Sequence, residues 1–307
     1  MHAAARLYHL EDATQAEVAD RLGTSRATVS RLLSEARRLG IVRIEVLAPA
    51  DVDDSDLSRQ TALALGLRAV HLSSVASRTL VGAALAPALS SALTSAGLTA
   101  GDVLLVSSGR TVYEAAQAEL PSLPGVLLAP TVGGQDELEA WYQTNEITRQ
   151  TAVKVGGTPT FLYAPALPSP RLYATLMAEE STRRVLDLWE RARCAVVGVG
   201  AAPLLRRSLP SFVPTDSPVL RHAVGDICTR VFDSDGREVP YPGSERLIAT
   251  SFELLRRVPV AIAVAVGQGK VPGIVAGARA GYFNTLVTDP PTAAALVAAV
   301  HEASVSP

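Results

Sequence analysis

The sequence is poor in several residue types, and each shortage argues against a class of protein. Its 307 residues include only two cysteines, Cys194 and Cys228, which stand far apart. Two cysteines are too few for a disulfide framework or a zinc cluster, so we expect each to be a small core residue in a reducing cytoplasm. The start of the chain lacks the apolar stretch of a signal peptide, and the longest apolar run, near 258–266, is too short to span a membrane. We therefore expect a cytoplasmic protein that has no membrane partner, no metal and no cofactor.

Net charge is also small, at −2 for the whole chain, which argues against a protein that coats nucleic acid along its entire surface. The charge is nevertheless unevenly placed. Residues 23–43 carry five arginines against one glutamate, whereas residues 1–22 carry two arginines against four carboxylates. A positive potential is therefore confined to one short N-terminal stretch, where it can attract a phosphate backbone.

That stretch overlaps a segment, 14–39, whose pattern predicts two short helices. Thr14 followed by Glu17 is a capping box that starts the first helix, and Gly23 can adopt the left-handed conformation that ends it. Ser25 can cap the second helix, which places apolar residues on one face. Two short helices joined by a glycine turn form a helix-turn-helix, whose second helix enters the DNA major groove.

The polar residues at the two helix starts fit contacts with double-stranded DNA. Short hydroxyls suit phosphates, and an arginine fork can reach base edges. An ordinary helical hairpin with a solvated arginine face is the alternative. The expected DNA contacts are Thr14, Gln15, Ser25, Arg26, Thr28 and Arg31.

The surrounding segments predict how the chain divides. A first helix is expected over 3–10, and a strand over 41–46 could form a wing that touches the DNA backbone through Arg43. The acidic, proline-broken segment 48–56 is expected to be a linker. The predicted organisation is a DNA-binding domain at 1–47, the linker at 48–56, and an effector and oligomerisation domain at 57–307.

From residue 57 onward, apolar strands alternate with helices, which predicts an α/β domain with a mainly parallel sheet covered on both faces. The expected strands lie at 69–72, 103–106, 126–129, 160–163, 195–198, 227–232, 260–266 and 285–288, with a hairpin closed by the turn 233–236. The expected helices include 57–65, 81–96, 112–120, 137–155, 271–280 and 291–302. Ligands of such sheets bind beside the carboxyl ends of strands and the starts of helices.

Three loops occupy such positions. Residues 107–111 offer hydroxyls, amides and a guanidinium for a phosphate, and residues 132–136 contain a double glycine that lets the backbone approach a ligand. Residues 267–270 end in Lys270, one of only two lysines. Each loop alone could be a plain glycine turn, but three at one sheet edge predict a small anionic ligand, phosphorylated in our interpretation. The predicted effector contacts in these loops are Ser107, Ser108, Gly109, Arg110, Thr111, Gly133, Gly134, Gln135, Gln268 and Lys270.

Taken together, these residues resemble the SorC/DeoR-type sugar-binding transcriptional regulators over essentially the whole chain. The resemblance rests on residues 15–42, on Val106-Ser-Ser-Gly-Arg-Thr111, on Ala223-Val-Gly-Asp-Ile-Cys228 with the following hairpin, and on residues 267–271 and 287–289. It implies a Rossmann-type effector domain related to sugar-phosphate isomerases and deaminases, and homo-oligomers, dimers or tetramers, that bind palindromic operators. It also implies that 107–111 and Lys270 hold a phosphate, while Gly134, Gln135 and Asp226 face the sugar.

The sequence departs from this family at three positions. Ser108 stands where the family often has an aromatic residue, and Val266 stands where a second glycine is common. Val132 precedes the double glycine, so no lysine there can form a Schiff base, and we expect noncovalent binding of the effector.

Two functions are compatible with these residues. The first is a DNA-binding regulator of carbohydrate metabolism controlled by a phosphorylated sugar or polyol, with no catalytic residues. The second is a sugar-phosphate isomerase or deaminase with an N-terminal helical arm, for which Asp226 and Asp136 would be the candidate general bases. His71, His222 and His301 are isolated, and such residues are more often structural, which favours the regulator over the enzyme. The placement of the arginines argues against a DNA-independent interaction protein.

Overall fold

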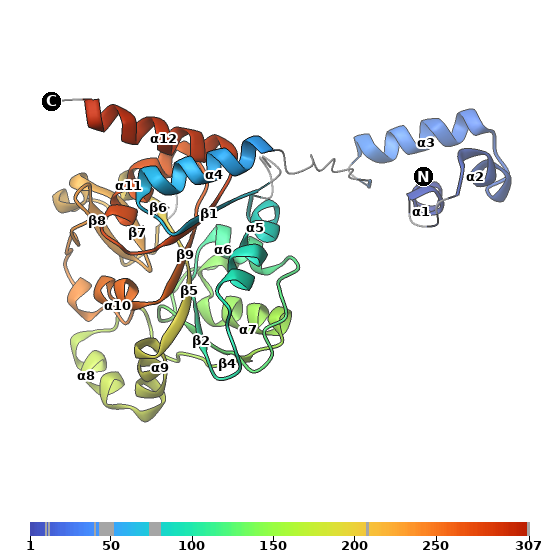
Figure 1. The fold of residues 1–307 in the computed structure, drawn as a ribbon. Helices are drawn as coiled ribbons and strands as arrows, with labels where there is room; N and C mark the ends of the chain where they lie inside the picture. The colour runs from blue at the N-terminus through green and yellow to red at the C-terminus, as the bar shows by residue number, and fades with distance from the viewer. Residues whose placement is uncertain are drawn as a thin grey trace. The chain divides into compact units, whose positions relative to one another are not determined.

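The fold of the chain is shown in Figure 1, a computed structural model that describes residues 1–9, 11, 13–39, 41–42, 52–73, 81–206 and 209–305. Contacts divide the chain into two units, Met1–Ala48 and Pro49–Pro307, which we describe separately. In neither unit does a described helix have the length and apolar character needed to cross a membrane.

The smaller unit consists of three helices, α1 (His2–His9), α2 (Gln15–Arg21) and α3 (Arg26–Arg38). The predicted capping box is present, because the Thr14 amide donates to Glu17 Oε2 over 2.8 Å and the Glu17 amide donates to Thr14 Oγ1 over 3.3 Å. Gly23 follows α2 with a φ of +61°, which glycine tolerates best. The helices pack through small apolar side chains: Ala4, Ala5, Ala13, Val18, Ala19, Val29, Leu33 and Ala36.

The predicted helix-turn-helix is thus confirmed, with helix bounds that differ little from those expected. The strand predicted over 41–46, with Arg43, lies outside the described residues from position 43 onward.

The larger unit is built on a seven-stranded, wholly parallel sheet in the order β1-β10-β9-β5-β2-β3-β4, which confirms the predicted α/β class. Alternate residues of the central strands enter two different cores. In β2, Leu104 and Val106 pack on one face, whereas Val103 and Leu105 pack on the other. The strands are β1 (Ala69–Leu72), β2 (Val103–Val106), β3 (Leu127–Pro130), β4 (Thr158–Pro159), β5 (Ala192–Gly198), β9 (Val260–Val264) and β10 (Thr285–Thr288).

Helices cover both faces of this sheet (Figure 1). Helices α5 (Val81–Ser95), α6 (Arg110–Ala116) and α7 (Thr144–Val155) form a core with one face. The other face is covered by α4 (Val52–Leu65), α9 (Glu180–Glu190), α10 (Phe252–Arg257), α11 (Val271–Arg279) and α12 (Pro290–Val305), while α8 (Pro170–Ala178) buries no residue. Helix α4 begins at Val52, so it includes part of the segment 48–56 that the sequence pattern assigned to a linker.

A second, antiparallel sheet of β6 (Gly200–Ala201), β7 (Ala223–Ile227) and β8 (Arg230–Asp233) stands beside the carboxyl end of β5. The single strand predicted over 227–232 is therefore wrong, because the chain reverses at Cys228 and Thr229, whose φ angles are +51° and +65°. The hairpin predicted around 233–236 is present, since the Val239 amide donates to the Val231 carbonyl over 2.8 Å.

Three other predicted elements differ from the structure. The strand expected over 160–163 is absent, because the Asn145 side chain satisfies both the amide and the carbonyl of Leu162 in place of a strand partner. The helix expected over 137–155 is divided into a 3₁₀ turn η1 (Ala140–Tyr142) and α7. The helix expected over 112–120 is α6, which begins at Arg110 and ends at Ala116.

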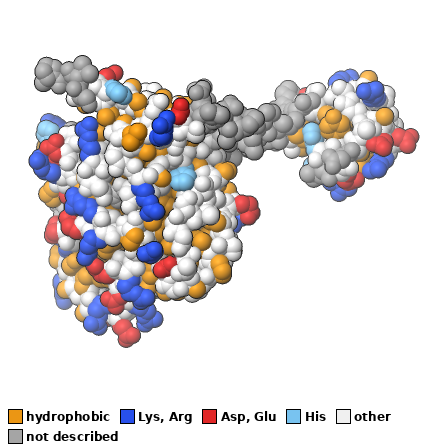
Figure 2. Space-filling view, viewed as in Figure 1, with side chains coloured by type: hydrophobic (Ala, Val, Ile, Leu, Met, Phe, Trp, Pro, Cys, Tyr) orange, Lys and Arg blue, Asp and Glu red, His pale blue; other side chains and the backbone are white. Residues whose placement is uncertain are grey.

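The strand order fixes where a ligand can bind. From β2 the chain moves outward through β3 to β4, and from β5 it moves in the opposite direction through β9 to β10. The crevice at such a reversal, beyond the carboxyl ends of the strands, is the usual ligand site of open α/β sheets. On the face of the larger unit seen in Figure 2, basic and acidic side chains are interspersed. This face therefore shows no extended patch of one charge.

Close packing of α5 on α6 holds the helix that begins at the crevice, and it depends on Gly82. A Cβ at this position would lie 2.5 Å from the Thr111 carbonyl oxygen and 2.8 Å from the Ala115 nitrogen. We expect Gly82→Ala to lower the free energy of unfolding by about 1–3 kcal/mol, although alanine favours a helix over glycine by about 1 kcal/mol. Chemical denaturation measures this. Ser91→Ala, at an exposed position of α5, is the control, and equal stability of both variants would contradict the packing argument.

Candidate effector site

A cavity of about 200 Å³ lies at the reversal of strand order. Its lining comes from the loops after β2, β3, β5 and β9 and from the antiparallel hairpin, so segments distant in sequence meet there. The lining residues are Ser108, Gly109, Arg110, Thr111, Val112, Gln135, Tyr142, Gly198, Val199, Gly200, Ala201, Arg206, Pro210, Asp226, Cys228, Thr229 and Lys270.

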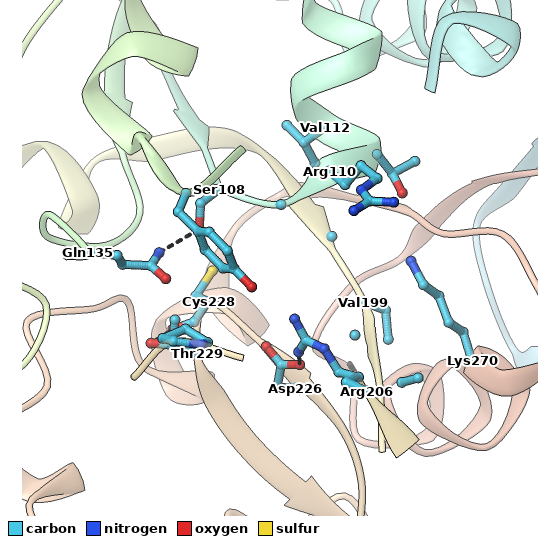
Figure 3. Close-up of a pocket in the computed structure, with 17 residues that line it drawn as sticks. Ser108, Arg110, Val112, Gln135, Val199, Arg206, Asp226, Cys228, Thr229 and Lys270 are labelled. Carbon is cyan, nitrogen blue, oxygen red and sulfur yellow. Dashed lines mark hydrogen bonds and ion pairs between the residues drawn. The ribbon is translucent and has the colours of Figure 1, made fainter. Parts of the chain in front are cut away.

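Two cations face each other on one side of this cavity. Arg110 opens α6 directly after Gly109, and Lys270 ends the 3₁₀ turn η5 (Gln268–Lys270) directly before α11. Figure 3 shows the Lys270 ammonium pointing toward Arg110. Gly109 directly precedes α6 and Gly267 directly precedes η5, with φ angles of +122° and +112°, a backbone conformation that residues with a Cβ rarely adopt. The glycines therefore make the turns that bring the two cations to the cavity.

The surroundings of Lys270 disfavour its positive charge. Burial is the main cause that lowers the pKa of Lys270 to about 8; the nearby Arg206 also lowers it, and Asp226 opposes the shift. A lysine whose charge is destabilised in the free protein gains when an anion arrives beside it. An anion beside Lys270 would therefore favour its charged form.

An ion pair lies in the same cavity, close enough to Lys270 to affect its charge. Arg206 Nη1 lies 2.5 Å from Asp226 Oδ1, and both side chains are largely buried. Asp226 is paired in register with Gly200, and a Cβ at Gly200 would lie 1.9 Å from that carboxylate oxygen. Glycine at this position thus gives the carboxylate the space to enter the cavity (Figure 3).

Gln135 provides a buried amide in the same cavity. Its Nε2 donates to Ser108 Oγ over 3.0 Å, while its Oε1 is buried and accepts no hydrogen bond from any of the described residues. A buried acceptor without a donor is costly, and a ligand hydroxyl that donates to Oε1 would remove that cost.

Most of the predicted effector contacts meet at this cavity. Seven of them line it: Ser108, Gly109, Arg110, Thr111, Gln135, Asp226 and Lys270. The remaining four, Ser107, Gly133, Gly134 and Gln268, do not.

Three of those four residues have a local structural role. Ser107 Oγ accepts from the Gly198 amide over 3.1 Å and donates to the Ser108 carbonyl, so it ties β2 to β5. Gly133 and Gly134 pack against residues 164–166, where a Cβ on Gly133 would lie 2.5 Å from the Ala164 carbonyl oxygen. Gln268 is exposed beside the cavity.

The sequence pattern did not indicate several residues that line the cavity. Arg206 follows a 3₁₀ turn in an irregular segment with no motif, and Tyr142 belongs to a stretch predicted as plain helix. Cys228 and Thr229 form a tight turn without the asparagine or glycine that usually marks one. Burial raises the pKa of the Cys228 thiol, so this cysteine is present as the neutral thiol. Among the described residues, no cluster of His, Cys, Asp or Glu could hold a metal ion.

The smaller unit presents a polar helix face. In α3, Val29, Leu33 and Ala36 are buried, whereas Arg26 and Arg31 are exposed on the opposite side with Ala27, Ser30 and Ser34. The hydroxyls of Thr14 and Ser25 cap the two helices, and Thr28 Oγ1 lies 3.0 Å from Ser25 Oγ, while Gln15 is half-buried. The arginines are therefore the side chains on this face with the longest reach.

A three-helix unit with an exposed arginine face and an α/β unit with a cation-lined cavity define a ligand-binding transcriptional regulator. Family models agree with both units. One described as "Putative sugar-binding domain" matches residues 36–298, and one described as "Crp-like helix-turn-helix domain" matches residues 4–50.

Individual relatives agree as well. The chain is 29% identical to the sorbitol operon regulator of Klebsiella pneumoniae over an alignment 312 residues long. The alignment covers 95% of this chain and 96% of that protein. It is 31% identical over 303 residues to the deoxyribonucleoside regulator of Bacillus subtilis, covering 96% of both. The crystal structure of the full-length regulator SorC from Klebsiella pneumoniae aligns with a TM-score of 0.75 at 29% identity over 96% of both chains. The chain belongs to the SorC/DeoR-type family of sugar-binding transcriptional regulators.

The lowered pKa of Lys270 predicts a pH-dependent effect on stability. The pKa in the folded protein, about 8, is below the ordinary 10.5, so charged Lys270 opposes folding fully below pH 8 and progressively less as the pH rises toward 10.5. We expect Lys270→Met to raise the free energy of unfolding by about 1–2 kcal/mol at pH 7 and by much less near pH 10.

Denaturant titrations at the two pH values measure the difference. The control is Lys154→Met, which removes the other lysine, in a solvent-exposed pair with Glu119 at 3.6 Å, and should change stability little at either pH. A Lys270→Met variant less stable than wild type at pH 7 would contradict the assignment.

Proposed function

We propose that this protein is a transcriptional regulator of carbohydrate metabolism whose binding to operator DNA is controlled by a phosphorylated sugar or polyol in the cavity at the β2–β5 reversal. In this proposal the larger unit is a sensor without catalytic residues, and the ligand binds noncovalently. The smaller unit reads double-stranded DNA, and the larger unit binds the effector and forms the homo-oligomer.

The observation that carries the proposal is the distribution of charge in the cavity. Arg110, Arg206 and Lys270 line it against a single carboxylate, Asp226. A phosphate between Arg110 and Lys270 could pair with both cations, and the amides in the first turn of α6 have no acceptor within the helix.

The remaining polar groups suit a hydroxylated carbon skeleton. Asp226 accepts hydrogen bonds, and Gln135 Oε1 lacks a donor among the described residues. Sugars and polyols supply hydroxyl donors to such acceptors. A cavity of about 200 Å³ is smaller than the 300 Å³ or more typical of drug-sized ligands, which favours a single small carbohydrate.

The enzyme alternative is less well supported. Of its two candidate bases, Asp226 is held by Arg206, and Asp136 is exposed and does not line the cavity. The matched relatives are named as regulators of a sorbitol operon and of deoxyribonucleosides. Turnover of a sugar phosphate at ordinary enzymatic rates would favour the alternative.

Thermal-shift screening tests the ligand class, because a ligand that binds only the folded state raises the unfolding temperature. Phosphorylated sugars and polyols should raise it, and their unphosphorylated forms should do so much less. We expect Lys270→Met to weaken binding of a stabilising phosphorylated compound by about 1.5–3 kcal/mol, the usual value of a hydrogen bond to a charged group.

Lys154→Met is again the matched control, since Lys154 does not line the cavity and its loss should leave affinity unchanged. Equal affinity of wild type and Lys270→Met would remove the phosphate role. Stabilisation by neutral sugars alone would replace the proposed effector with an unphosphorylated one.

DNA reading is tested on α3. We expect Arg31→Ala to weaken binding to a duplex selected by the wild-type protein from a random library by about 1–3 kcal/mol, if Arg31 contacts a base. Arg21→Ala is the control, because Arg21 lies on α2 in an ion pair with Glu11 at 3.4 Å. Fluorescence anisotropy on the selected and a scrambled duplex measures both variants, and an unchanged preference for the selected duplex in Arg31→Ala would assign base reading to another residue.

Recognition of DNA by a helix-turn-helix implies a homo-oligomer. Helix-turn-helix regulators bind two half-sites about one helical turn apart through a two-fold axis. An effector that binds one arrangement of the oligomer more tightly shifts the population toward it, and with it the affinity for the operator.

A further inference from the structure

The 3₁₀ turn η1 contacts the anion-facing side of the cavity through Trp141. The guanidinium carbon of Arg110 lies 4.3 Å from the centre of the Trp141 ring, so the cation stacks on the aromatic face. The Gly109 amide also donates to the Trp141 carbonyl over 2.8 Å. The turn thus holds both the backbone before Arg110 and the end of its side chain.

The conformation of the Arg110 side chain depends on this contact. Its side chain is exposed, and it forms no ion pair within the part of the chain that the structure describes. A long, unpaired arginine samples many rotamers, and ordering it on binding costs free energy. An aromatic ring under the guanidinium plane restricts those rotamers but leaves the N–H groups at its edge available to a ligand.

We infer that Trp141 is a positioning residue for the ligand's anionic group: by stacking under Arg110 it holds the guanidinium where that group binds. This inference rests on the proposed function, since it takes the ligand to be anionic, and it adds the residue that prepares the site. Neither the sequence motif of 107–111 nor its family resemblance indicates Trp141, which lies thirty residues beyond that loop.

The next residue strengthens the assignment of the turn to ligand binding. Tyr142 is 5% exposed and lines the cavity, with its ring centre 6.4 Å from that of Trp141. The backbone of the turn is closed by the Tyr142 amide, which donates to the Glu139 carbonyl over 3.0 Å. One short turn therefore places a ring beneath the arginine and another in the cavity wall.

Binding of inorganic phosphate, measured by calorimetry with chloride at matched ionic strength as the reference, tests the inference. We expect Trp141→Leu to raise the Kd for phosphate about three- to tenfold, the range of a partly exposed cation–π contact, and Trp141→Phe to retain most of the affinity. In an Arg110→Met background, the same Trp141→Leu change should have no further effect, because the residue acts through Arg110.

Intrinsic fluorescence gives a second measurement that does not depend on the leucine variant folding. The chain has two tryptophans, and Trp189 is buried, with its Nε1–H donated to the Pro130 carbonyl over 2.7 Å. A saturable fluorescence change on phosphate binding should occur in wild type and disappear in Trp141→Phe.

The outcomes distinguish failure of the inference about Trp141 from failure of the proposed function. If wild type binds phosphate and Trp141→Leu binds it equally, or if the effect of Trp141→Leu is the same with and without Arg110, the inference is wrong and the proposed function stands. A phosphate-induced fluorescence change that persists in Trp141→Phe also overturns the inference. If wild type binds neither inorganic phosphate nor any phosphorylated sugar, both are wrong.

Discussion

The reversal of strand order between β2 and β5 is the constraint on which the effector site depends. Two neighbouring parallel strands send their following segments in opposite directions, which leaves a crevice between them. Ser107 secures this arrangement, because its hydroxyl bridges the end of β2 to the Gly198 amide at the end of β5. The cations, the carboxylate and the amide all reach the cavity from segments that this crevice brings together.

The charged side chains of the cavity determine which ligands it favours. A protein interior weakens the screening of charge, so cations that face one another in a half-closed space are disfavoured until an anion joins them. Burial is the main cause of the lowered pKa of Lys270, and the positive charge of Arg206 adds to it, whereas Asp226 is already paired with Arg206. The cavity thus combines cationic side chains with hydrogen-bond acceptors, and the proposal of a phosphorylated, hydroxylated ligand rests on this combination.

The smaller unit is simpler and was more predictable. Its helix starts are set by side chains three residues apart, such as Thr14 and Glu17, and its core uses the residues of one helix face. Local spacing was sufficient there, because each cap is an interaction within a single turn of helix. The same is true of the all-apolar strands β2 and β9, which could be located from their composition.

Prediction from sequence failed where a contact between distant segments replaced a local preference. Phe161 to Tyr163 has the composition of a strand, but the Asn145 side chain occupies the Leu162 backbone groups. Cys228 and Thr229 carry no turn signal, yet burial of their side chains keeps a left-handed turn that would be unfavourable in isolation. The double glycine at Gly133 and Gly134 suggested a ligand, but the structure uses it for contact with residues 164–166.

By itself, the amino-acid sequence determined the class of fold, the helix-turn-helix and the loops that carry Arg110 and Lys270, because periodicity, capping and glycine turns are properties of neighbouring residues. Only the tertiary structure decided that Arg206, Tyr142 and the end of β5 share the cavity with those loops, and that Trp141 lies under Arg110. The physical reason is that a binding site depends on the distances between segments that are far apart in sequence. Strand order and side-chain packing across the whole domain determine those distances.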